Sequence, residues 1–188
     1  MTTTKKNNKG LILTFIAVFT LPVILAKLAL DNHWFTEAST NKGELLQPSL
    51  DMNNLVSEQD PKKWKLVYVL PAQCDVTCEN AIYSLTQLHS ALGKEQDRAE
   101  SIVITLEDSD PKAISALANN KHLRVLKANQ QSVNQVFQQV TTNGIFIADT
   151  LNNIILRYPT QSDTQQAVLH SRDILSDMRK VLKLSRIG

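Results

Sequence analysis

The chain has little of what several large classes of protein require. Its 188 residues include only 2 Cys, 5 Gly and 6 Pro, and aromatic residues make up 5%. The sequence has no glycine-rich phosphate-binding loop, no internal repeat and no low-complexity tract. The net charge of +2 is close to balanced, and no basic stretch is interleaved with aromatic residues. These absences argue against phosphate-loop enzymes, repeat folds and nucleic-acid partners.

A long apolar run near the N-terminus predicts a membrane anchor. Residues 10–30 form about 31 Å of helix at 1.5 Å per residue, enough to cross a hydrocarbon core. Lys5, Lys6 and Lys9 precede the run, and lysines of this kind mark the cytoplasmic side. No small-x-small cleavage site ends the run, which favours an uncleaved signal anchor over a cleaved signal peptide. Residues 1–9 are therefore expected in the cytoplasm.

The absence of arginine from the N-terminal part bears on whether the protein is bacterial or mitochondrial. No arginine precedes Arg98. Because mitochondrial transit peptides are rich in arginine, the sequence favours a bacterial inner-membrane protein with a single span. The C-terminal domain is then expected in the periplasm, where disulfides persist.

Composition and periodicity divide the remainder into a linker and one domain. Residues 31–61 are polar and are expected to form a periplasmic linker, and residues 62–188 a folded domain of ordinary size. Strands are expected at 64–70, 101–106, 122–127, 144–149 and 154–158, and helices at 80–92, 111–119, 133–140 and 165–184. This order predicts an α/β fold with a thioredoxin-like mixed sheet flanked by helices, preceded by one N-terminal transmembrane helix.

The two cysteines of the chain, Cys74 and Cys78, follow the first expected strand and precede the first helix of the domain. A helix N-terminus favours the thiolate, which is the reactive and metal-binding form of cysteine. Asp75 and Glu79 oppose this effect, because their negative charges disfavour a neighbouring thiolate. We expect Cys74 to be the more exposed thiol and Cys78 the more buried one, in the first helical turn.

The chain resembles the Sco/SenC proteins in three features: an N-terminal anchor, a thioredoxin-like domain, and a C-x-x-x-C segment after the first core strand. The segment here is 74–78, residues 145–154 resemble the hairpin of that family, and the resemblance covers about residues 64–184. Glu79 departs from the family pattern, which has a proline there. The chain is also similar to small anchored cytochrome-oxidase-associated proteins. The resemblance implies assembly of a cytochrome c oxidase, with an oxidase subunit or its assembly factors as partners.

The resemblance also implies copper, bound by the two thiolates and by a histidine shortly before the hairpin. Residues 139–144 hold that position and contain no histidine. Copper bound by Cys74 and Cys78 is therefore a hypothesis that lacks its third ligand. The histidines of the chain lie elsewhere in the sequence: His33, His89, His122 and His170.

Three functions stay open for Cys74 and Cys78: copper ligands, catalytic residues of a thiol–disulfide oxidoreductase, or a structural disulfide in a non-catalytic docking module. Many thioredoxin-like oxidoreductases carry a proline just before the strand that begins here at Gly144, and this chain does not. A disulfide closing so short a loop contributes only about 2 kcal/mol in the chain-entropy model, less than a staple between distant segments. We expect an assembly factor rather than a general oxidoreductase.

Overall fold

The computed structural model describes residues 9–31, 41–57 and 59–185. The chain divides into two compact units, Met1–Thr40 and Asn41–Gly188, which are described separately below.

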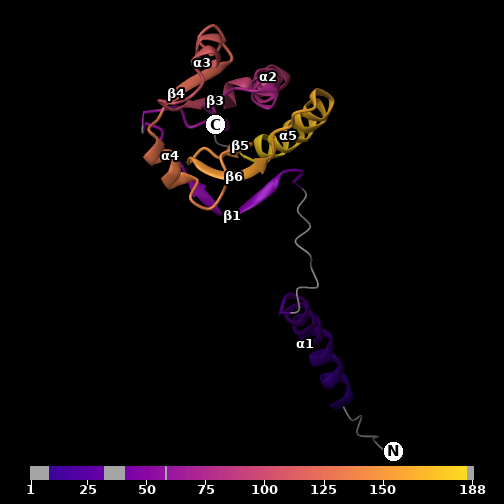
Figure 1. Ribbon diagram of the computed structural model, residues 1–188. Helices are drawn as coiled ribbons and strands as arrows, with labels where there is room; N and C mark the ends of the chain where they lie inside the picture. Colours follow the sequence, from indigo (N-terminus) through magenta and orange to yellow (C-terminus); the bar gives the residue numbers. More distant parts are fainter. Residues whose placement is uncertain (1–8, 32–40, 58, 186–188) are drawn as a thin grey trace, which may run out of the picture. The chain divides into compact units, whose positions relative to one another are not determined.

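The first unit contains helix α1, Lys9–Asp31, which includes Pro22 (Figure 1). Its large apolar side chains from Leu11 to Leu28 are exposed, and it is long and apolar enough to cross a membrane by length and composition. The hydroxyl groups of Thr14 and Thr20 donate to backbone carbonyls one turn earlier, so these polar groups are satisfied within the helix. Residues 1–8, which are expected in the cytoplasm, lie outside the described residues.

The second unit is built on a mixed sheet with the strand order β1-β6-β5-β2-β3-β4 (Figure 1). The strands β2, β3 and β4 run parallel to one another, whereas β5, β6 and β1 are joined by antiparallel pairs. Their bounds are β1 Glu44–Asp51, β2 Trp64–Val69, β3 Ala99–Thr105, β4 Leu123–Lys127, β5 Ile145–Ala148 and β6 Asn153–Tyr158. The predicted α/β fold with a thioredoxin-like mixed sheet is confirmed.

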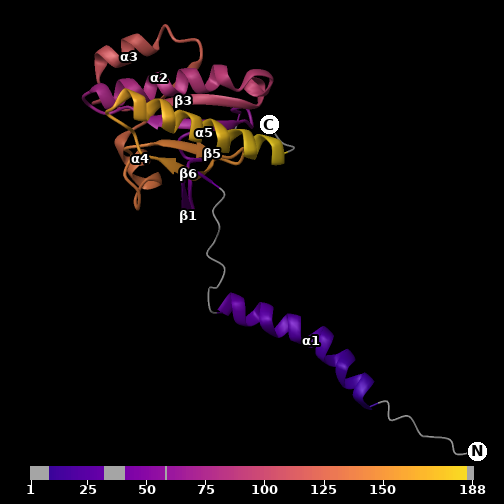
Figure 2. The same cartoon turned by 90° about the vertical axis from the view of Figure 1, so that its right-hand side faces the viewer.

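Helices cover both faces of this sheet. The helices α2 and α5 lie side by side on one face, together with α3, and α4 lies on the other face (Figures 1 and 2). Their bounds are α2 Val76–Ala91, α3 Pro111–Leu117, α4 Gln130–Val136 and α5 Thr164–Leu184, with a 3₁₀ helix at Gly93–Arg98.

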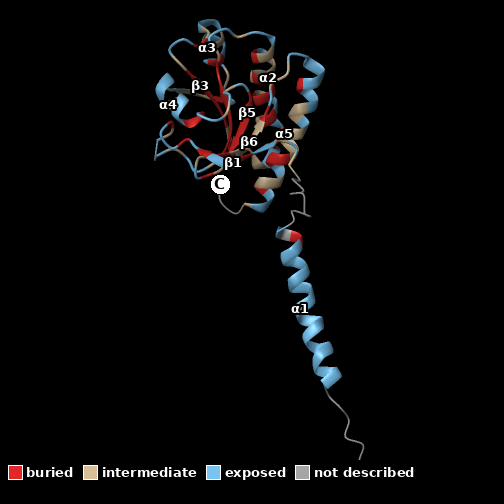
Figure 3. Cartoon of the chain, turned by 60° about the horizontal axis from the view of Figure 1, so that its bottom comes forward, coloured by how far each residue is buried: buried red, intermediate tan, exposed pale blue. Residues whose placement is uncertain are grey.

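The alternation of strand β2 explains the two halves of the core. Leu66 and Tyr68 face α2 and α5 in the first core cluster, whereas Val67 and Val69 face α4 in the second. Successive side chains of a strand point to opposite faces, so a strand buried on both sides is apolar at nearly every position, and Lys65 is the exception in β2. Figure 3 shows the buried residues gathered on the sheet strands and on the helix faces that cover them.

Strand β1 corrects the expected linker. Residues 44–51 lie within the segment predicted as a linker, yet they pair antiparallel with β6 at the edge of the sheet. Leu46 and Leu50 are buried in the second core cluster, and the pairing is irregular between Leu45 and Leu50. The strand has a weak sequence signal, because its apolar residues do not alternate regularly with polar ones and Pro48 interrupts it. The linker prediction is therefore wrong for these residues.

A buried carboxylate holds the start of β1 against α5. Asp177 accepts hydrogen bonds from the backbone N–H groups of Lys42 and Gly43, at 2.5 and 3.1 Å, and from the Tyr158 hydroxyl at 2.8 Å. Lys180 forms an ion pair with it at 3.0 Å. Burial alone would raise the pKa of Asp177, but these donors hold the pKa below its usual range. The carboxylate is thus charged at neutral pH.

The bounds of two helices differ from the sequence prediction. Helix α4 begins at Gln130 rather than at Val133, because Asn129 is the N-cap and accepts from the N–H of Ser132. Ser132 therefore lies within the first turn of α4 and does not cap it. Helix α2 begins at Val76, four residues earlier than expected, and this earlier start brings Cys78 into its first turn.

Candidate functional site

The two cysteines form a disulfide at the junction between β2 and α2. Cys74 and Cys78 are joined with a Cα–Cα distance of 5.1 Å. Asp75 is the N-cap of α2, and its side chain accepts from the N–H of Cys78 at 3.0 Å. A cap of this type satisfies one of the unpaired N–H groups at a helix start, so the loop leads directly into the helix.

The two sulfur-bearing residues differ strongly in exposure. Cys78 is 1% exposed and belongs to the first core cluster, whereas Cys74 is half-buried and packs against the edge of that cluster. The predicted difference in exposure is confirmed. A thiol arriving from solvent can therefore reach the sulfur of Cys74 and not that of Cys78.

The loop after β3 holds the cysteine loop in place. Asp110 accepts from the N–H of Cys74 at 3.0 Å and caps α3 by accepting from the N–H groups of Lys112 and Ala113. Its own N–H donates to the carbonyl of Pro71 at 3.0 Å. An aspartate directly before a proline is a local signal for a helix start, but the contact of Asp110 with Cys74 joins residues 36 positions apart and has no local signal.

A second contact, which the sequence also does not reveal, joins the same two loops. The Ser109 hydroxyl donates to the carbonyl of Leu70 at 2.7 Å and accepts from the N–H of Leu106 at 2.9 Å. Ser109 is buried. The end of β2 and the end of β3 are therefore fastened on the side where the disulfide lies.

The charges around the disulfide are mostly negative. Backbone donation from Cys74, and then from Ala113 and Lys112, holds the pKa of Asp110 below its usual range. Burial, together with the charge of Asp75, raises the pKa of Tyr68 to about 12. These carboxylates disfavour a thiolate at Cys74, as the sequence predicts from Asp75 and Glu79.

Two open cavities flank the disulfide. A groove of about 550 Å³ is lined by Cys74 together with residues of α2 and α3. A second cavity of about 420 Å³ is lined by Cys78, by the loop 70–73, and by Thr142 and Asn143 before β5. Cys74 therefore lines the groove between α2 and α3.

The histidines do not complete a copper site with the cysteines. His89 and His122 lie near each other, with ring centroids 5.6 Å apart, in a different pocket, and His170 lies beside Gln161. Within the described ranges, no group of three or more His, Cys, Asp and Glu side chains is placed to hold a metal ion. His33 lies outside those ranges. The residues present do not fit a site of two thiolates and a histidine.

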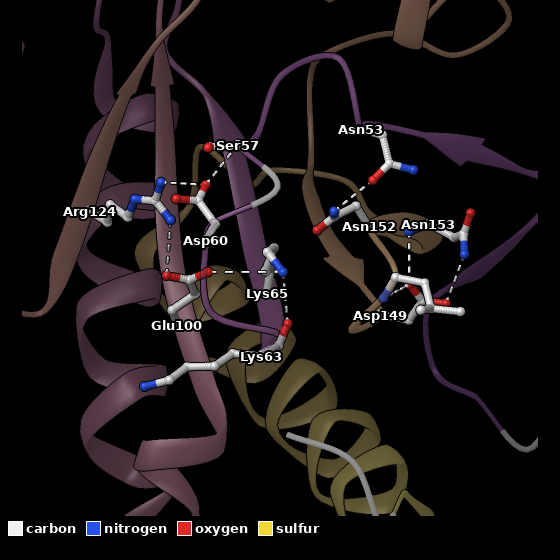
Figure 4. Close-up of polar contacts among 11 residues, drawn as sticks. Asn53, Ser57, Asp60, Lys63, Lys65, Glu100, Arg124, Asp149, Asn152 and Asn153 are labelled. Atoms are coloured by element: carbon white, nitrogen blue, oxygen red, sulfur yellow. Dashed lines mark hydrogen bonds and ion pairs between the residues drawn. The ribbon is translucent and has the colours of Figure 1, made fainter.

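A cluster of charged residues lies at the opposite end of β2 (Figure 4). Lys65 is fully buried, donates to the carbonyl of Lys63 at 2.9 Å and lies 4.0 Å from Glu100. Arg124 bridges Glu100 at 3.5 Å and Asp60 at 2.6 Å. Desolvation lowers the pKa of Lys65. Because Lys65 is sealed from solvent, this cluster fixes the start of β2 and offers no reactive group.

Figure 4 also shows the turn between β5 and β6, where Asp149 accepts from the N–H groups of Leu151 and Asn153, each at 2.8 Å. Asn152, which has a φ of 68°, donates to the side chain of Asn53 at 2.7 Å. Asparagine tolerates this left-handed conformation better than most residues. These contacts hold the predicted hairpin and the segment after β1 together.

Comparison with known proteins assigns the domain. Residues 64–185 match the family model described as "Transmembrane-like, thioredoxin-like, C-terminal domain". The chain belongs to this family. The match covers the whole sheet except β1, together with the disulfide loop and the helices from α2 to α5. A comparison with curated protein sequences finds no match.

Solved structures similar to the chain include Sco/SenC proteins, as the sequence resemblance predicts. ScoI from Bradyrhizobium japonicum, with copper bound, is 15% identical with a TM-score of 0.43, over 69% of this chain and 97% of that one. A SCO1/SenC family lipoprotein from Bacillus anthracis is 12% identical with a TM-score of 0.49, over 76% and 95%. A thiol:disulfide interchange protein DsbE from Chlorobium tepidum is 12% identical with a TM-score of 0.49, over 72% and 94%. The fold assignment rests on the family match and the sheet order.

Proposed function

We propose that this protein is a membrane-anchored thiol–disulfide exchange protein that acts through Cys74 and Cys78. The observation that carries the proposal is the disulfide at the β2–α2 junction, with one sulfur accessible and the other buried in the first turn of α2. In this proposal, α1 is the anchor and the domain faces the periplasm. The partner is a subunit or assembly factor of a respiratory cytochrome c oxidase, as the Sco/SenC resemblance implies.

The exchange follows from the difference in exposure. A partner thiolate attacks Sγ of Cys74, the bond between Cys74 and Cys78 breaks, and Cys78 leaves as a thiolate that takes a proton from water. A second thiol of the partner then attacks its own sulfur in the mixed disulfide, and Cys74 leaves. The partner loses two electrons and becomes a disulfide, and the protein becomes a dithiol. The reverse sequence reduces a partner disulfide, so the two reduction potentials set the direction.

Helix α2 assists the departure of Cys78. The backbone N–H of Cys78 points to Asp75, and the first-turn N–H groups of a helix carry partial positive charge. Asp75 offsets part of this charge, and the remainder stabilises the thiolate that forms when the disulfide opens. The buried residue is therefore suited to leave and to return, and the accessible residue to be attacked.

Copper takes no part in this proposal. Cys74 and Cys78 in the reduced form would offer two soft ligands, which suit Cu(I). The structure supplies no third ligand from the described residues. Titration of the reduced chain with Cu(I) in the presence of a competing chelator tests the copper hypothesis: tight one-to-one binding, lost in both Cys74→Ser and Cys78→Ser, would establish it.

A structural disulfide in a non-catalytic docking module is the second candidate function, and the negative charge around Cys74 favours it. Asp110 and Asp75 disfavour the thiolate needed for fast exchange. The reduction potential separates the two candidates, because structural disulfides have values below about −300 mV.

The test is equilibration of the full-length chain in nanodiscs with dithiothreitol buffers, followed by alkylation and mass measurement. We expect the Cys74–Cys78 pair to have a reduction potential above about −300 mV. We also expect a mixed disulfide to accumulate on the Cys78→Ser variant and not on the Cys74→Ser variant. A lower potential, or equal trapping by both variants, would refute exchange at Cys74 and leave the docking module.

A further inference from the structure

The groove beside Cys74 runs between two helices of the same face. One wall is a single face of α2, because residues three and four positions apart lie together on a helix. The other wall is α3, where Ala113 and Ala116 leave the space open. At the far end, Asn120 donates to the hydroxyl of Thr86 at 2.9 Å. The groove is thus open at the disulfide and bounded by a hydrogen bond at its other end.

The lining of the groove is largely apolar. Ile82 and Leu117 form part of it and pack in or against the first core cluster. Tyr83 is 58% exposed at the rim, an unusual exposure for a large aromatic side chain in a packed domain. An apolar side chain that enters between Tyr83 and Ala116 would be removed from water on several sides.

The end of the groove at Cys74 is acidic. The groove itself is lined by two carboxylates and one ammonium group, a net charge of −1, and the second cavity adds two carboxylates, so the surface around the disulfide carries a net charge of −3. The groups are Asp75, Glu79, Asp108 and Asp110, and Lys112. An attacking thiolate is an anion, so this surface repels it unless the attacking segment carries positive charge.

We infer that the groove and its acidic end select, for exchange at Cys74, a partner segment with basic residues beside its cysteine and an apolar side chain about three residues away. This inference rests on the proposed function. The length of the groove sets this approximate spacing, because its α2 wall extends from Glu79 to Thr86, roughly 10 Å, and about three residues of extended chain cover that length. The occupant is thus a basic, cysteine-bearing segment of a partner protein.

The test uses short peptides as probes against the oxidised full-length chain in neutral phosphatidylcholine nanodiscs. The probes are acetylated and amidated Arg-Cys-Ala-Ala-Leu-Arg, the same peptide with Glu for both Arg, and the same peptide with Ser for Leu. The rate of mixed-disulfide formation is followed by mass spectrometry. Each rate is divided by the rate of the same peptide with a neutral small disulfide, which removes differences in intrinsic thiol reactivity.

We expect the basic leucine peptide to react about tenfold faster than either control at low ionic strength. The preference for basic residues should shrink in 0.5 M salt, because exposed charges are screened, whereas the preference for leucine should not. Glu79→Gln should reduce the preference for basic residues.

Two variants of α3 and its C-cap give a matched pair. Ala116→Trp fills the groove and should abolish the preference for leucine over serine. Ala118→Trp introduces the same side chain at an exposed C-cap position that does not line the groove, and should leave the preference unchanged. Circular dichroism of both variants checks that the fold is kept.

Two outcomes would overturn the inference and are distinct from each other. If dithiothreitol reduces the disulfide but the normalised rates of the three peptides are equal, or both tryptophan variants act alike, the groove does not select the partner and the proposed function stands. If neither dithiothreitol nor any peptide opens the disulfide in the native chain, the proposed function fails, and this inference fails with it.

Discussion

The negative charge of Asp110 disfavours the thiolate form of Cys74. The substitution Asp110→Asn removes that charge and keeps an oxygen that accepts from the amide of Cys74. The carboxylate lies 3.0 Å from that amide nitrogen. Its negative charge therefore lies close to the sulfur of the same residue and opposes the formation of a thiolate there. Because the carboxylate is in contact with water, which screens this repulsion, we expect its removal to raise the thiolate fraction at a given pH by roughly threefold.

The assay isolates one thiol. Cys78→Ser leaves Cys74 as the only cysteine, and its alkylation by iodoacetamide is compared with that of Cys78→Ser/Asp110→Asn over a range of pH. The double variant should react roughly threefold faster at any pH where the thiolate is the minor form. Asp108→Asn is the matched control, because Asp108 is exposed and lines the other cavity. An unchanged rate, or an equal gain from Asp108→Asn, would refute the electrostatic argument.

Three further predictions concern stability, measured as the free energy of unfolding in urea. Reducing the Cys74–Cys78 disulfide should lower it by about 2 kcal/mol, because the bond closes a short loop; a reduced form as stable as the oxidised one would contradict this. Asp177→Asn should cost about 3 kcal/mol, because the buried carboxylate accepts several hydrogen bonds. The lowered pKa of Asp177 means that its contribution is full at neutral pH and is lost as the pH falls below about 4, so the parent chain should be more sensitive to acid than the variant. Lys65→Met should change the free energy by less than about 1 kcal/mol, since Glu100 keeps a second cationic partner; a loss of several kcal/mol would show that Lys65 is essential to the cluster.

The sequence predicts the elements whose signals are local. The apolar run of β2, the β-branched run of β3 and the amphipathic pattern of α5 each identify an element from its own residues. The loop that contains the two cysteines also has a local signal, because Pro71 follows the apolar run of β2 and the helix pattern begins soon after it. The difference in exposure between Cys74 and Cys78 follows from the position of the helix start between them.

The features that the sequence does not predict depend on pairing between distant segments. Strand β1 pairs with β6, more than a hundred positions later, and half of its own residues are polar, without a regular alternation. Lys65 sits in an apolar run, where a lysine is unexpected, but the β2–β3 register places it directly opposite Glu100. Cross-strand register decides such pairs, and hydrophobic periodicity does not contain it. The contact between Asp110 and Cys74 likewise joins residues that are far apart in the sequence, so no local pattern predicts it.

The acidic surface around the disulfide offers a physical reason for a membrane anchor in the proposed function. Carboxylates beside Cys74 slow exchange with anionic thiols in general, so random reaction with free thiols is suppressed. A partner in the same membrane meets the site at a much higher effective concentration than a soluble thiol does. In the proposed function, α1 thus brings the protein close to its partner in the membrane, and the groove discriminates between partner segments. A low intrinsic reactivity of Cys74 is then compatible with a specific role. A general oxidoreductase, which must react with many partners, would gain nothing from this combination.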